Sequence, residues 1–304
     1  MSGSSSPLDV AIVIPSFNQH RLLVECLDSV RADLAESGLA GRIVVVDNAS
    51  WDGSAEMVAS RFPDVTLIEN EVNLGFAVAC NQGGKLYQAR HVVLLNNDAK
   101  LQLGSLSAMV NYADTHAEVG AVTGRLLSPE GRERYPARFF WQRWWPPRPR
   151  LHELSWVPGT GVLLKREALE AVGWLDEDFF FYNEDLDLSW RLKKGGWHLV
   201  YHPRVVVWHH EGESSRLIRP RALLEGYRGA LLLVRKHHGR LAYGVTRFAM
   251  RVEVAVRLAW LRVAGGRGEE AIARREAYEA VREVLRRGVA HSPDDGDVAA
   301  AREN

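Results

Sequence analysis

The sequence predicts an α/β fold, in which helices flank a mostly parallel central sheet and a helical extension follows toward the C-terminus. Two observations predict it. Short runs of β-branched residues alternate with segments of helical periodicity from residue 9 onward. Polar residues directly follow several of the apolar runs, as they do at the carboxyl ends of parallel strands. With 304 residues, of which 46% are hydrophobic, the chain is long enough for one large or two smaller globular domains.

The first strand is expected at 9–15, where β-branched residues form a short apolar run that Pro15 ends. A helix is expected at 20–35, because apolar residues recur there at helical spacing. The same patterns predict further strands at 42–50, 65–70, 91–99 and 121–128, and helices at 54–62, 73–83 and 103–117. This alternation indicates a parallel sheet with helices on both faces.

Polar residues stand at the ends of three predicted strands, at Pro15–Asn18, Asp47–Asn48 and Asn96–Asp98. Ligands of parallel sheets bind beyond the carboxyl ends of the strands, so these three groups are expected to converge on one site.

The alternation breaks at 129–155, which is rich in arginine, proline and tryptophan. A segment of this length without periodicity is often a lid or a binding loop, and a surface insertion is the alternative. Residues 156–169 predict a turn, a strand and a helix, and residues 197–215 predict two short strands and a polar loop.

Helices are expected at 221–238, 241–264 and 269–287. These patterns divide the chain into an α/β domain at 9–215, a helical region at 216–290 and a disordered tail at 291–304.

The helix at 241–264 is predicted to be amphipathic. Its apolar residues gather on one face, and Arg247, Arg251 and Arg262 gather roughly opposite. This pattern suits a helix lying on anionic lipid. The alternative is a helix packed on the α/β domain or on a second subunit. Packing on a second subunit would make the protein a homodimer.

The composition limits the partners and the compartment. The formal net charge is zero, so no global field favours nucleic acid, although residues 204–267 are locally basic. Cys26 and Cys80 are expected to be buried free thiols. The N-terminus has no signal-peptide pattern, and no apolar run is long enough to cross a bilayer. We therefore expect a cytoplasmic enzyme, peripheral on the inner face of the membrane.

The segment FFFYNEDLDLSWR at 179–191 contains three closely spaced carboxylates, Glu184, Asp185 and Asp187. The three carboxylates repel one another and lose solvation if they are buried, so folding alone gives little reason for the cluster. Catalysis gives one, because a carboxylate at the mouth of a cleft can take a proton from a substrate hydroxyl. The alternative is a helix N-terminus capped by Asn183. The two interpretations are compatible, because a helix that starts here would hold Asp185 rigidly.

Asp98 is a candidate metal ligand, and one histidine of the adjacent pair His209 and His210 could supply a second ligand. A carboxylate at a strand end suits a divalent cation, and an imidazole nitrogen at the same cation would suit manganese as well as magnesium. A strand-terminal turn at Asp98 and a surface turn at His209 and His210 are the alternatives. Alternation along the preceding strand predicts that only one of the two histidines reaches the site.

Asp47 could accept a hydrogen bond from a nucleobase or a ribose, or it could simply cap a loop. Gly75 is expected at a helix start, where the missing side chain lets a phosphate or sugar approach backbone N–H groups. Gly159 and Gly161 permit a tight turn, near a substrate or as a plain bend.

These segments, IVIPSFN, VVVDNASWDGS, NLGFAVACNQG, LLNNDA, the stretch at 157–197 and HHEGESS, together resemble family 2 glycosyltransferases. They are most similar to the branch that contains rhamnosyltransferases of bacterial cell-envelope glycan synthesis. The resemblance spans roughly residues 9–240. It implies a GT-A fold, a nucleotide-sugar donor, Mg²⁺ or Mn²⁺ as cofactor, and inversion at the anomeric carbon.

The resemblance also implies residue roles. Asp185 matches the general base, and Asp98 and His209 match the metal-binding positions, with Asn96 standing where many members have an aspartate. The residues expected to bind the donor are Pro15, Phe17, Asn18, Asp47, Asn48, Gly75, Asn81 and Asn97. The residues expected to bind the acceptor are Trp156, Gly159, Thr160, Glu184, Trp190 and Arg191, with the loop at 129–155 shaping acceptor choice.

The leading hypothesis is an inverting transferase that moves L-rhamnose from dTDP-rhamnose to a hydroxyl of a glycan or lipid-linked glycan. The same family with UDP-glucose, UDP-galactose or UDP-GlcNAc as donor is the second hypothesis. A non-catalytic scaffold that binds sugar nucleotides is the third. The presence of Asp98, Asp185 and His209 together argues against the third, because an inactive member is expected to have lost one of them.

Overall fold

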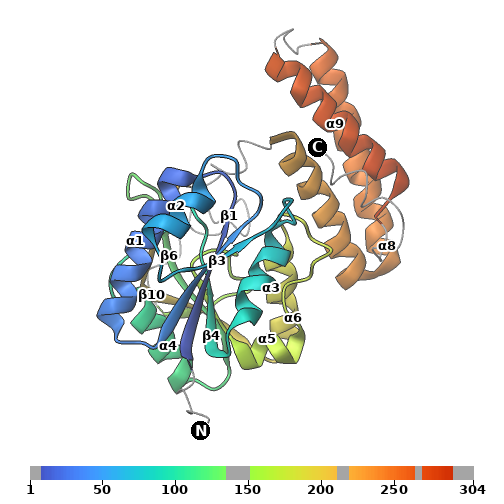
Figure 1. The fold of residues 1–304 in the computed structure, drawn as a ribbon. Helices are drawn as coiled ribbons and strands as arrows, with labels where there is room; N and C mark the ends of the chain where they lie inside the picture. Colours follow the sequence, from blue (N-terminus) through green and yellow to red (C-terminus); the bar gives the residue numbers. More distant parts are fainter. Residues whose placement is uncertain (1–7, 135–150, 211–218, 264–268, 290–304) are drawn as a thin grey trace. The chain divides into compact units, whose positions relative to one another are not determined.

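The computed structural model describes residues 8–134, 151–210, 219–263 and 269–289. Within these residues, ten strands form one sheet in the order β3-β2-β1-β4-β9-β6-β10-β5, with β7 and β8 paired to β6 and β10 (Figure 1). The strands are β1 (Leu8–Ser16), β2 (Gly41–Asp47), β3 (Thr66–Glu69), β4 (Ala89–Leu94), β5 (Ala99–Leu101), β6 (Val119–Leu127), β7 (Glu133–Arg134), β8 (His152–Glu153), β9 (Val162–Lys165) and β10 (His198–His209).

The strands β3, β2, β1, β4, β6 and β10 run in one direction, and β9 lies antiparallel between β4 and β6. The predicted α/β fold with a mostly parallel sheet is therefore confirmed. One detail is wrong: residues 198–209 form a single strand rather than two. A register shift between Tyr201 and Val206 interrupts its pairing, and a bulge at this point explains the break in the sequence pattern.

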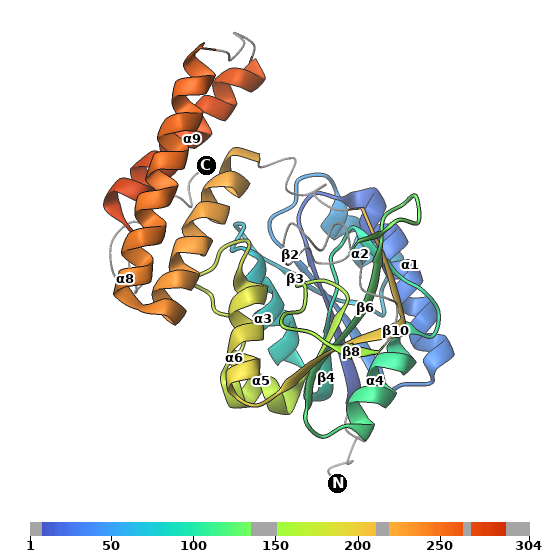
Figure 2. The ribbon, with the colours of Figure 1, turned by 180° about the vertical axis from the view of Figure 1, so that it is seen from behind.

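Helices cover both faces of the sheet (Figures 1 and 2). They are α1 (His20–Ser37), α2 (Ser54–Arg61), α3 (Phe76–Leu86), α4 (Ser105–Thr115), α5 (Arg166–Val172) and α6 (Glu184–Lys194). The apolar residues of α1, α2 and α4 pack on one face, and those of α3, α5 and α6 pack on the other. The thiols of Cys26 and Cys80 are buried, one in each of these two cores.

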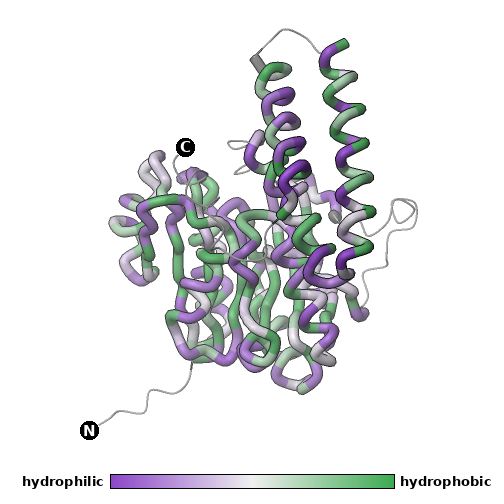
Figure 3. The backbone as a smooth tube through the Cα atoms, turned by 90° about the vertical axis from the view of Figure 1, so that its right-hand side faces the viewer, coloured by the Kyte–Doolittle hydropathy of each residue, from purple (hydrophilic) through white to green (hydrophobic). Residues whose placement is uncertain are grey.

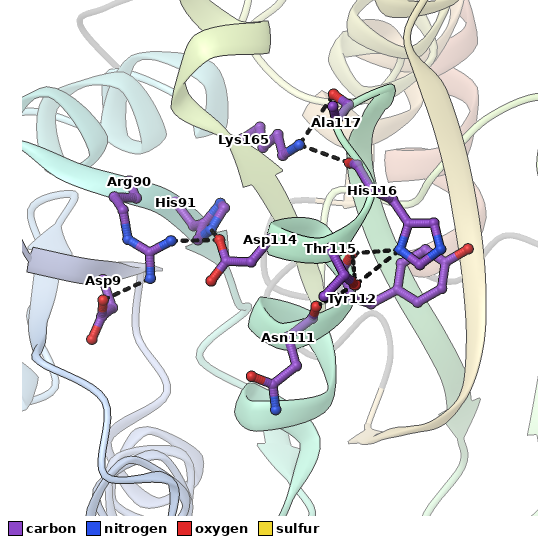
Figure 4. Close-up of polar contacts among 10 residues, drawn as sticks. All are labelled: Asp9, Arg90, His91, Asn111, Tyr112, Asp114, Thr115, His116, Ala117 and Lys165. Atoms are coloured by element: carbon purple, nitrogen blue, oxygen red, sulfur yellow. Dashed lines mark hydrogen bonds and ion pairs between the residues drawn. The ribbon is translucent and has the colours of Figure 1, made fainter.

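A polar network occupies the edge where the parallel strands begin (Figure 4). Arg90 forms ion pairs with Asp9 and Asp114, and Nε2 of His91 lies 2.8 Å from Oδ1 of Asp114. Lys165 donates to the carbonyl oxygen of His116 at 2.8 Å. These contacts join β1, β4, β9 and the end of α4. The polar residues at this edge of the sheet therefore stabilise the fold.

His91 is expected to make the protein less stable in acid. Burial lowers the pKa of His91, against the opposing effect of Asp114. The folded state then binds fewer protons than the unfolded chain, so the free energy of unfolding falls as pH drops below the ordinary histidine pKa of about 6.5. The loss of melting temperature between about pH 7.5 and about pH 5.5 should be smaller in His91→Gln than in the wild type. An equal loss in both proteins would contradict this assignment.

The chain divides into two compact units. One contains residues 1–176 and 185–214, and the other contains residues 177–184 and 215–304. The boundary expected at 215/216 lies outside the described residues. Residues 177–184 differ from the expected division, because the sequence placed them in the α/β domain and they group instead with the helical unit.

The helical unit contains α8 (Arg219–Val263) and α9 (Glu269–Arg287). Gly239 interrupts α8 with a φ of 78° and a ψ of 178°, so its two halves correspond to the helices expected at 221–238 and 241–264. The helix expected at 269–287 is confirmed as α9.

The segment 177–184 is held by the first half of α8. Phe179 is buried in a core with Leu231 and Leu232. Asp178 accepts a hydrogen bond from Nζ of Lys236 at 2.7 Å. The residues that lead into α6 are therefore anchored within the helical unit.

Gly229 is required where α8 passes this segment. A Cβ atom at Gly229 would lie 2.9 Å from the carbonyl oxygen of Tyr182 and 2.7 Å from Nδ2 of Asn183. Both of these residues have left-handed backbones, with φ of 70° and 72°. Asparagine tolerates this conformation better than tyrosine does, so the surrounding contacts must stabilise it.

The second half of α8 packs on α9. Val254 and Leu258 share a core with Tyr278 and Val281. Arg247 donates to the carbonyl oxygens of residues 285 and 286 and so satisfies the end of α9. The expectation that Arg247 lies on a free polar face is therefore wrong.

Some sequence predictions fall outside the described residues. They are the disordered tail at 291–304, residues 135–150 of the predicted loop at 129–155, and residues 211–215 of the polar loop.

Candidate functional site

Ser16 joins the ends of three neighbouring parallel strands. Its carbonyl oxygen accepts the backbone N–H of Asn48 at 2.8 Å, and its hydroxyl accepts Nδ2–H of Asn97 at 3.2 Å. Because β1 lies between β2 and β4, the polar residues that follow these strands meet at Ser16. The predicted convergence of the strand ends is confirmed.

Asp47 presents an unsatisfied acceptor at the end of β2. Its Oδ2 accepts the backbone N–H of Ser50 at 2.8 Å, while its Oδ1 is buried without a hydrogen-bond partner among the described residues. Asn18 presents an unsatisfied donor: its Oδ1 accepts the N–H of Trp51 at 2.8 Å, and its buried Nδ2 has no partner within the same residues.

Buried polar atoms without partners are costly, so a ligand that pairs with both is expected here. The imide edge of uracil or thymine offers an N–H for Asp47 and a carbonyl oxygen for Asn18. Aromatic surface lies nearby, because the rings of Phe17 and Trp51 pack edge to face with centroids 5.2 Å apart. Trp51 is 73% exposed, which leaves its ring available for contact with a planar ligand.

Asn48 ties this corner to the start of α3. Its Nδ2 donates to the carbonyl oxygen of Gly75 at 3.2 Å, and its Oδ1 accepts Nδ2–H of Asn70 at 2.9 Å. Gly75 directly precedes α3, as predicted, with a φ of 89° and a ψ of 173° that are essentially restricted to glycine. The backbone at the start of α3 is therefore fixed relative to β2.

Asp98 and His209 meet beside the end of β4. Oδ1 of Asp98 lies 3.0 Å from Nε2 of His209, and both side chains are largely buried. This oxygen nevertheless has no hydrogen-bond partner among the described residues. The backbone N–H of His210 donates to the carbonyl oxygen of Asp98 at 3.1 Å, and no side-chain contact of His210 is seen among the described residues. The prediction that only one of the two histidine side chains reaches the site is consistent with these contacts.

The Asp98–His209 pair fits a divalent cation. Nε2 of His209 lies 3.0 Å from Oδ1 of Asp98 and 3.3 Å from Nδ2 of Asn96, and in the tautomer with Nε2 unprotonated this nitrogen and the carboxylate oxygen are both available to a cation. Two electron-rich atoms 3.0 Å apart favour a cation beside them. The described residues contain no group of three or more His, Cys, Asp or Glu side chains that could hold a metal. Two protein ligands are enough for a cation that also takes oxygen atoms from substrate phosphates and water.

Asp185 is the second residue of α6, which begins at Glu184 as the helix interpretation predicts. Its carboxylate accepts the backbone N–H of Leu186 at 2.8 Å, and the nearby backbone N–H of Gly159 also acts to lower its pKa. Burial outweighs these hydrogen bonds and raises the pKa of Asp185 to about 6. A carboxylate with this pKa is ionised at neutral pH and basic enough to accept a proton from a hydroxyl group.

A short chain of contacts links Asp185 to the Asp98 side of the site. The backbone of Gly159 lies beside the Asp185 side chain, and the hydroxyl group of the neighbouring Thr160 accepts the backbone N–H of Asn96 at 3.0 Å. Asn96 in turn contacts His209. The base candidate and the metal-ligand candidates therefore belong to one connected site within the α/β unit.

Two residues predicted to bind substrate have structural contacts instead. Asn81 forms reciprocal hydrogen bonds with the backbone of Leu175, at 2.8 and 3.1 Å. Arg191 forms an ion pair with Asp187 at 2.7 Å and donates to the backbone carbonyl oxygens of residues 172–174. These contacts do not support donor binding by Asn81 or acceptor binding by Arg191, because the fold already uses their polar groups.

Other predicted contact residues are compatible with the site without defining it. Pro15 lies inside β1 opposite Val46. Trp156 and Trp190 are half-buried, and Glu184 is buried. Their roles in substrate binding stay predictions.

The sequence analysis gave no individual role at the site to Ser16, Ser50, Asn70 or Trp51. Three of these are small polar residues whose importance lies in hydrogen bonds to residues distant in sequence, which no local pattern reveals. Trp51 carried a usable signal, because a large aromatic residue in the polar run DNASWDGS has no role in a core.

Comparisons with known proteins identify the family of the chain. A family model described as "Glycosyltransferase like family 2" matches residues 7–224. The chain is 26% identical to N-acetylglucosaminyl-diphospho-decaprenol L-rhamnosyltransferase of Mycobacterium tuberculosis, over 71% of this chain and 81% of that relative. It is 30% identical to the pre-mycofactocin glycosyltransferase of the same organism, over 75% of this chain, but the match spans only 48% of that protein's length.

Solved structures share the fold at low sequence identity. The mannosyltransferase PcManGT of Pyrobaculum calidifontis, in complex with GDP-Man and Mn²⁺, superposes with a TM-score of 0.57 and 21% identity, over 93% of this chain and 85% of that one. TarS residues 1–349 of S. aureus superpose with a TM-score of 0.53 and 12% identity, over 94% and 93% of the two chains. The fold is GT-A, and the family match covers most of the chain. The protein therefore belongs to glycosyltransferase family 2 and resembles the rhamnosyltransferases of that family.

Proposed function

We propose that the protein transfers L-rhamnose from dTDP-rhamnose to a hydroxyl group of a glycan or lipid-linked glycan, with inversion at the anomeric carbon. The observation that carries the proposal is Asp185, a carboxylate with a pKa of about 6 that is connected through Gly159 and Thr160 to the Asp98–His209 pair. The name of the M. tuberculosis relative supports the choice of rhamnose and of a lipid-linked acceptor. Such an acceptor places the reaction in cell-envelope polysaccharide synthesis, at the cytoplasmic face of the membrane.

In the proposed reaction, Asp185 accepts the proton of the acceptor hydroxyl group as its oxygen attacks the anomeric carbon. The bond between that carbon and the diphosphate oxygen breaks on the opposite face, so one in-line displacement inverts the centre. Asp98 and His209 are the residues that would hold Mg²⁺ or Mn²⁺. When bound, the cation would stabilise the negative charge of the departing diphosphate.

A second donor class is favoured by one specific observation. The unsatisfied Asp47 and Asn18 atoms complement the imide edge that thymine and uracil share. UDP-glucose, UDP-galactose and UDP-GlcNAc are therefore the alternative donors, and the same site chemistry would apply to them.

A thermal-shift screen tests the donor assignment. dTDP-rhamnose, the three UDP-sugars and the free nucleoside diphosphates are each added with and without Mn²⁺ to the wild type and to Asp98→Ala. A ligand that binds only the folded state raises the melting temperature. We expect the largest metal-dependent shift with dTDP-rhamnose, and its loss in Asp98→Ala. A larger shift with a UDP-sugar would reassign the donor. The absence of any shift with any nucleotide at saturating concentrations would contradict the transferase proposal.

Asp47→Ala is expected to raise the KM for the donor about 10- to 100-fold with little change in kcat. The substitution removes a charged acceptor for the base N–H, and such hydrogen bonds contribute about 1.5–3 kcal/mol. The base lies far from the bond that breaks, so the effect falls on binding. Steady-state kinetics with varied donor checks this, and an unchanged KM would show that Asp47 only caps its loop.

The rate should fall in acid with an apparent pKa near 6. Burial raises the pKa of Asp185 to about 6, so the base is progressively protonated below that pH, whereas an ordinary aspartate would stay ionised to about pH 4. The measurement is the pH profile of kcat/KM at saturating metal. An acidic limb close to pH 4 would mean that Asp185 is not the group whose ionisation limits the rate.

A further inference from the structure

The second half of α8 has two apolar faces. One packs on α9 through Val254, Leu258 and Leu261. The other is exposed, and we call it the exposed stripe. It consists of Leu241, Val245, Phe248, Val252, Val256, Trp260 and Val263. These side chains are between 49% and 90% exposed. Figure 3 shows the alternation of hydrophobic and hydrophilic residues along the helices of this unit. A helix with a single covered face would carry polar residues at these positions, so the exposed stripe requires a partner.

The exposed stripe repeats at intervals of eleven residues. Leu241, Val252 and Val263 are eleven apart, and so are Val245 and Val256. Eleven residues make about three α-helical turns, so the stripe runs nearly straight along a straight helix. Helices that wrap around each other in a left-handed coil need a seven-residue repeat instead. A straight stripe on one side of a helix suits a flat apolar surface.

Three arginines line one margin of the exposed stripe at the same interval. Arg240, Arg251 and Arg262 are exposed and stand about 16 Å apart along the helix. No ion pair is formed by these three within the described residues. Long arginine side chains at the edge of an apolar face can reach the anionic headgroups of a bilayer while the apolar residues enter it.

A second copy of the helix is a poorer partner than lipid. The segment 240–263 contains one acidic residue, Glu253, and this carboxylate is already bound to Arg257 at 2.8 Å. Pairing two copies would therefore bring the arginine margins together without acids to neutralise them. No helix among the described residues has the length and apolar character needed to cross a bilayer, so the helix would lie on the surface.

We propose that the exposed stripe and its arginine margin form a docking surface for an anionic lipid bilayer. Docking is independent of the transfer reaction, because none of these residues belongs to the donor or metal site. It would hold the enzyme at the surface where a lipid-linked acceptor is embedded.

Sedimentation of the full chain with vesicles tests this proposal. Vesicles of phosphatidylglycerol mixed with phosphatidylcholine are compared with pure phosphatidylcholine, at low and high salt. The double variant Phe248→Ser/Trp260→Ser probes the stripe, and Arg251→Gln/Arg262→Gln probes the margin. Ile272→Ser and Arg274→Gln, which are exposed positions on α9, are the matched controls. Light scattering over a range of concentrations reports the oligomeric state of each protein.

The wild type should bind the anionic vesicles, more weakly at high salt. Each arginine charge removed should lower the partition coefficient about five-fold, so the margin variant should lose about 25-fold. The stripe variant should lose at least about ten-fold, and both controls should stay within about two-fold of the wild type. Absence of binding to anionic vesicles, or equal losses in the controls, would overturn the proposal. The proposal would also be overturned if the wild type were a dimer and the stripe variant a monomer, because the exposed stripe would then be a subunit interface.

Transfer to a short water-soluble acceptor separates this result from the proposed function. The stripe and margin variants should keep wild-type rates in that assay while losing vesicle binding. If no protein transfers sugar but the vesicle results hold, the docking surface stands and the proposed donor or acceptor is wrong. A margin variant that fails to bind but also melts at a much lower temperature would be misfolded. The proposal is then tested by two remaining results: the loss of vesicle binding in the stripe variant, and the weaker binding of the wild type at high salt.

Discussion

Asp185→Asn is expected to lower kcat about 10³-fold, within the 10²- to 10⁴-fold range typical of a positioned general base. Asparagine keeps the size of the side chain but cannot take the proton of the acceptor hydroxyl group. The melting temperature at pH 8 should stay the same or rise. The folded-state pKa of Asp185 is raised above its ordinary value, so the ionised carboxylate destabilises the folded protein at any pH above about 6, and the substitution removes that cost. Stopped-time assays and thermal unfolding measure the two effects.

Asp187→Asn is the matched control, two residues further along α6. Its buried carboxylate pairs with the half-buried guanidinium of Arg191 at 2.7 Å, so this substitution leaves that guanidinium without its charged partner. We expect a lower melting temperature, equivalent to about 1–3 kcal/mol, and a small change in kcat. If the two variants lost activity equally, the role of Asp185 would be indistinguishable from holding the helix.

Asp98→Asn is expected to lower kcat/KM about 10²- to 10³-fold and to abolish the response to added Mn²⁺. The amide removes the negative charge that would hold the cation, and with it the stabilisation of the leaving diphosphate. Titration calorimetry with Mn²⁺ and the donor measures the metal directly, and initial rates measure the consequence.

Asp64→Asn is a suitable control for Asp98→Asn. Asp64 is an exposed carboxylate paired with Arg31 at 3.1 Å, so its loss should leave both metal binding and rate unchanged. Full activity of Asp98→Asn in the presence of a chelator would mean that diphosphate departure does not depend on a metal at this position.

The sequence predicted the sheet well because its strands are buried on both faces. Runs such as AIVIP and IVVVD contain few polar residues, and each ends in residues that a core would not tolerate. The positions of Asp47, Asp98 and Gly75 follow from that pattern. The antiparallel placement of β9 between β4 and β6 could not be predicted, because strand direction depends on long-range pairing that composition does not encode.

The contacts of individual polar side chains were predicted less well. Asn81 and Arg191 are types of residue that bind ligands, but in this fold they bind backbone groups of 172–175. Thr160 accepts the N–H of Asn96, a contact that the sequence did not predict, and its expected place near the acceptor stays a prediction. Each of these side chains contacts residues that are distant in sequence. A local motif does not show whether a polar side chain binds a ligand or forms a hydrogen bond with the protein backbone.

The segment 177–184 shows the same limit at the level of domains. Its aromatic run directly precedes α6, and the sequence placed it in the α/β domain. The buried Phe179 and the Asp178–Lys236 pair instead anchor it in the helical unit. A run of phenylalanines predicts burial, but the sequence does not say which core receives them.

The configuration of the transferred sugar tests the central claim most directly. The full chain is incubated with dTDP-rhamnose, Mn²⁺ and a short-chain lipid-linked N-acetylglucosamine acceptor, and the product is examined by NMR. We predict one dTDP released for each sugar transferred, an anomeric configuration opposite to that of the donor, and almost no product with Asp185→Asn. A product with the donor's configuration, or transfer that is unchanged in Asp185→Asn, would contradict direct displacement with Asp185 as the base.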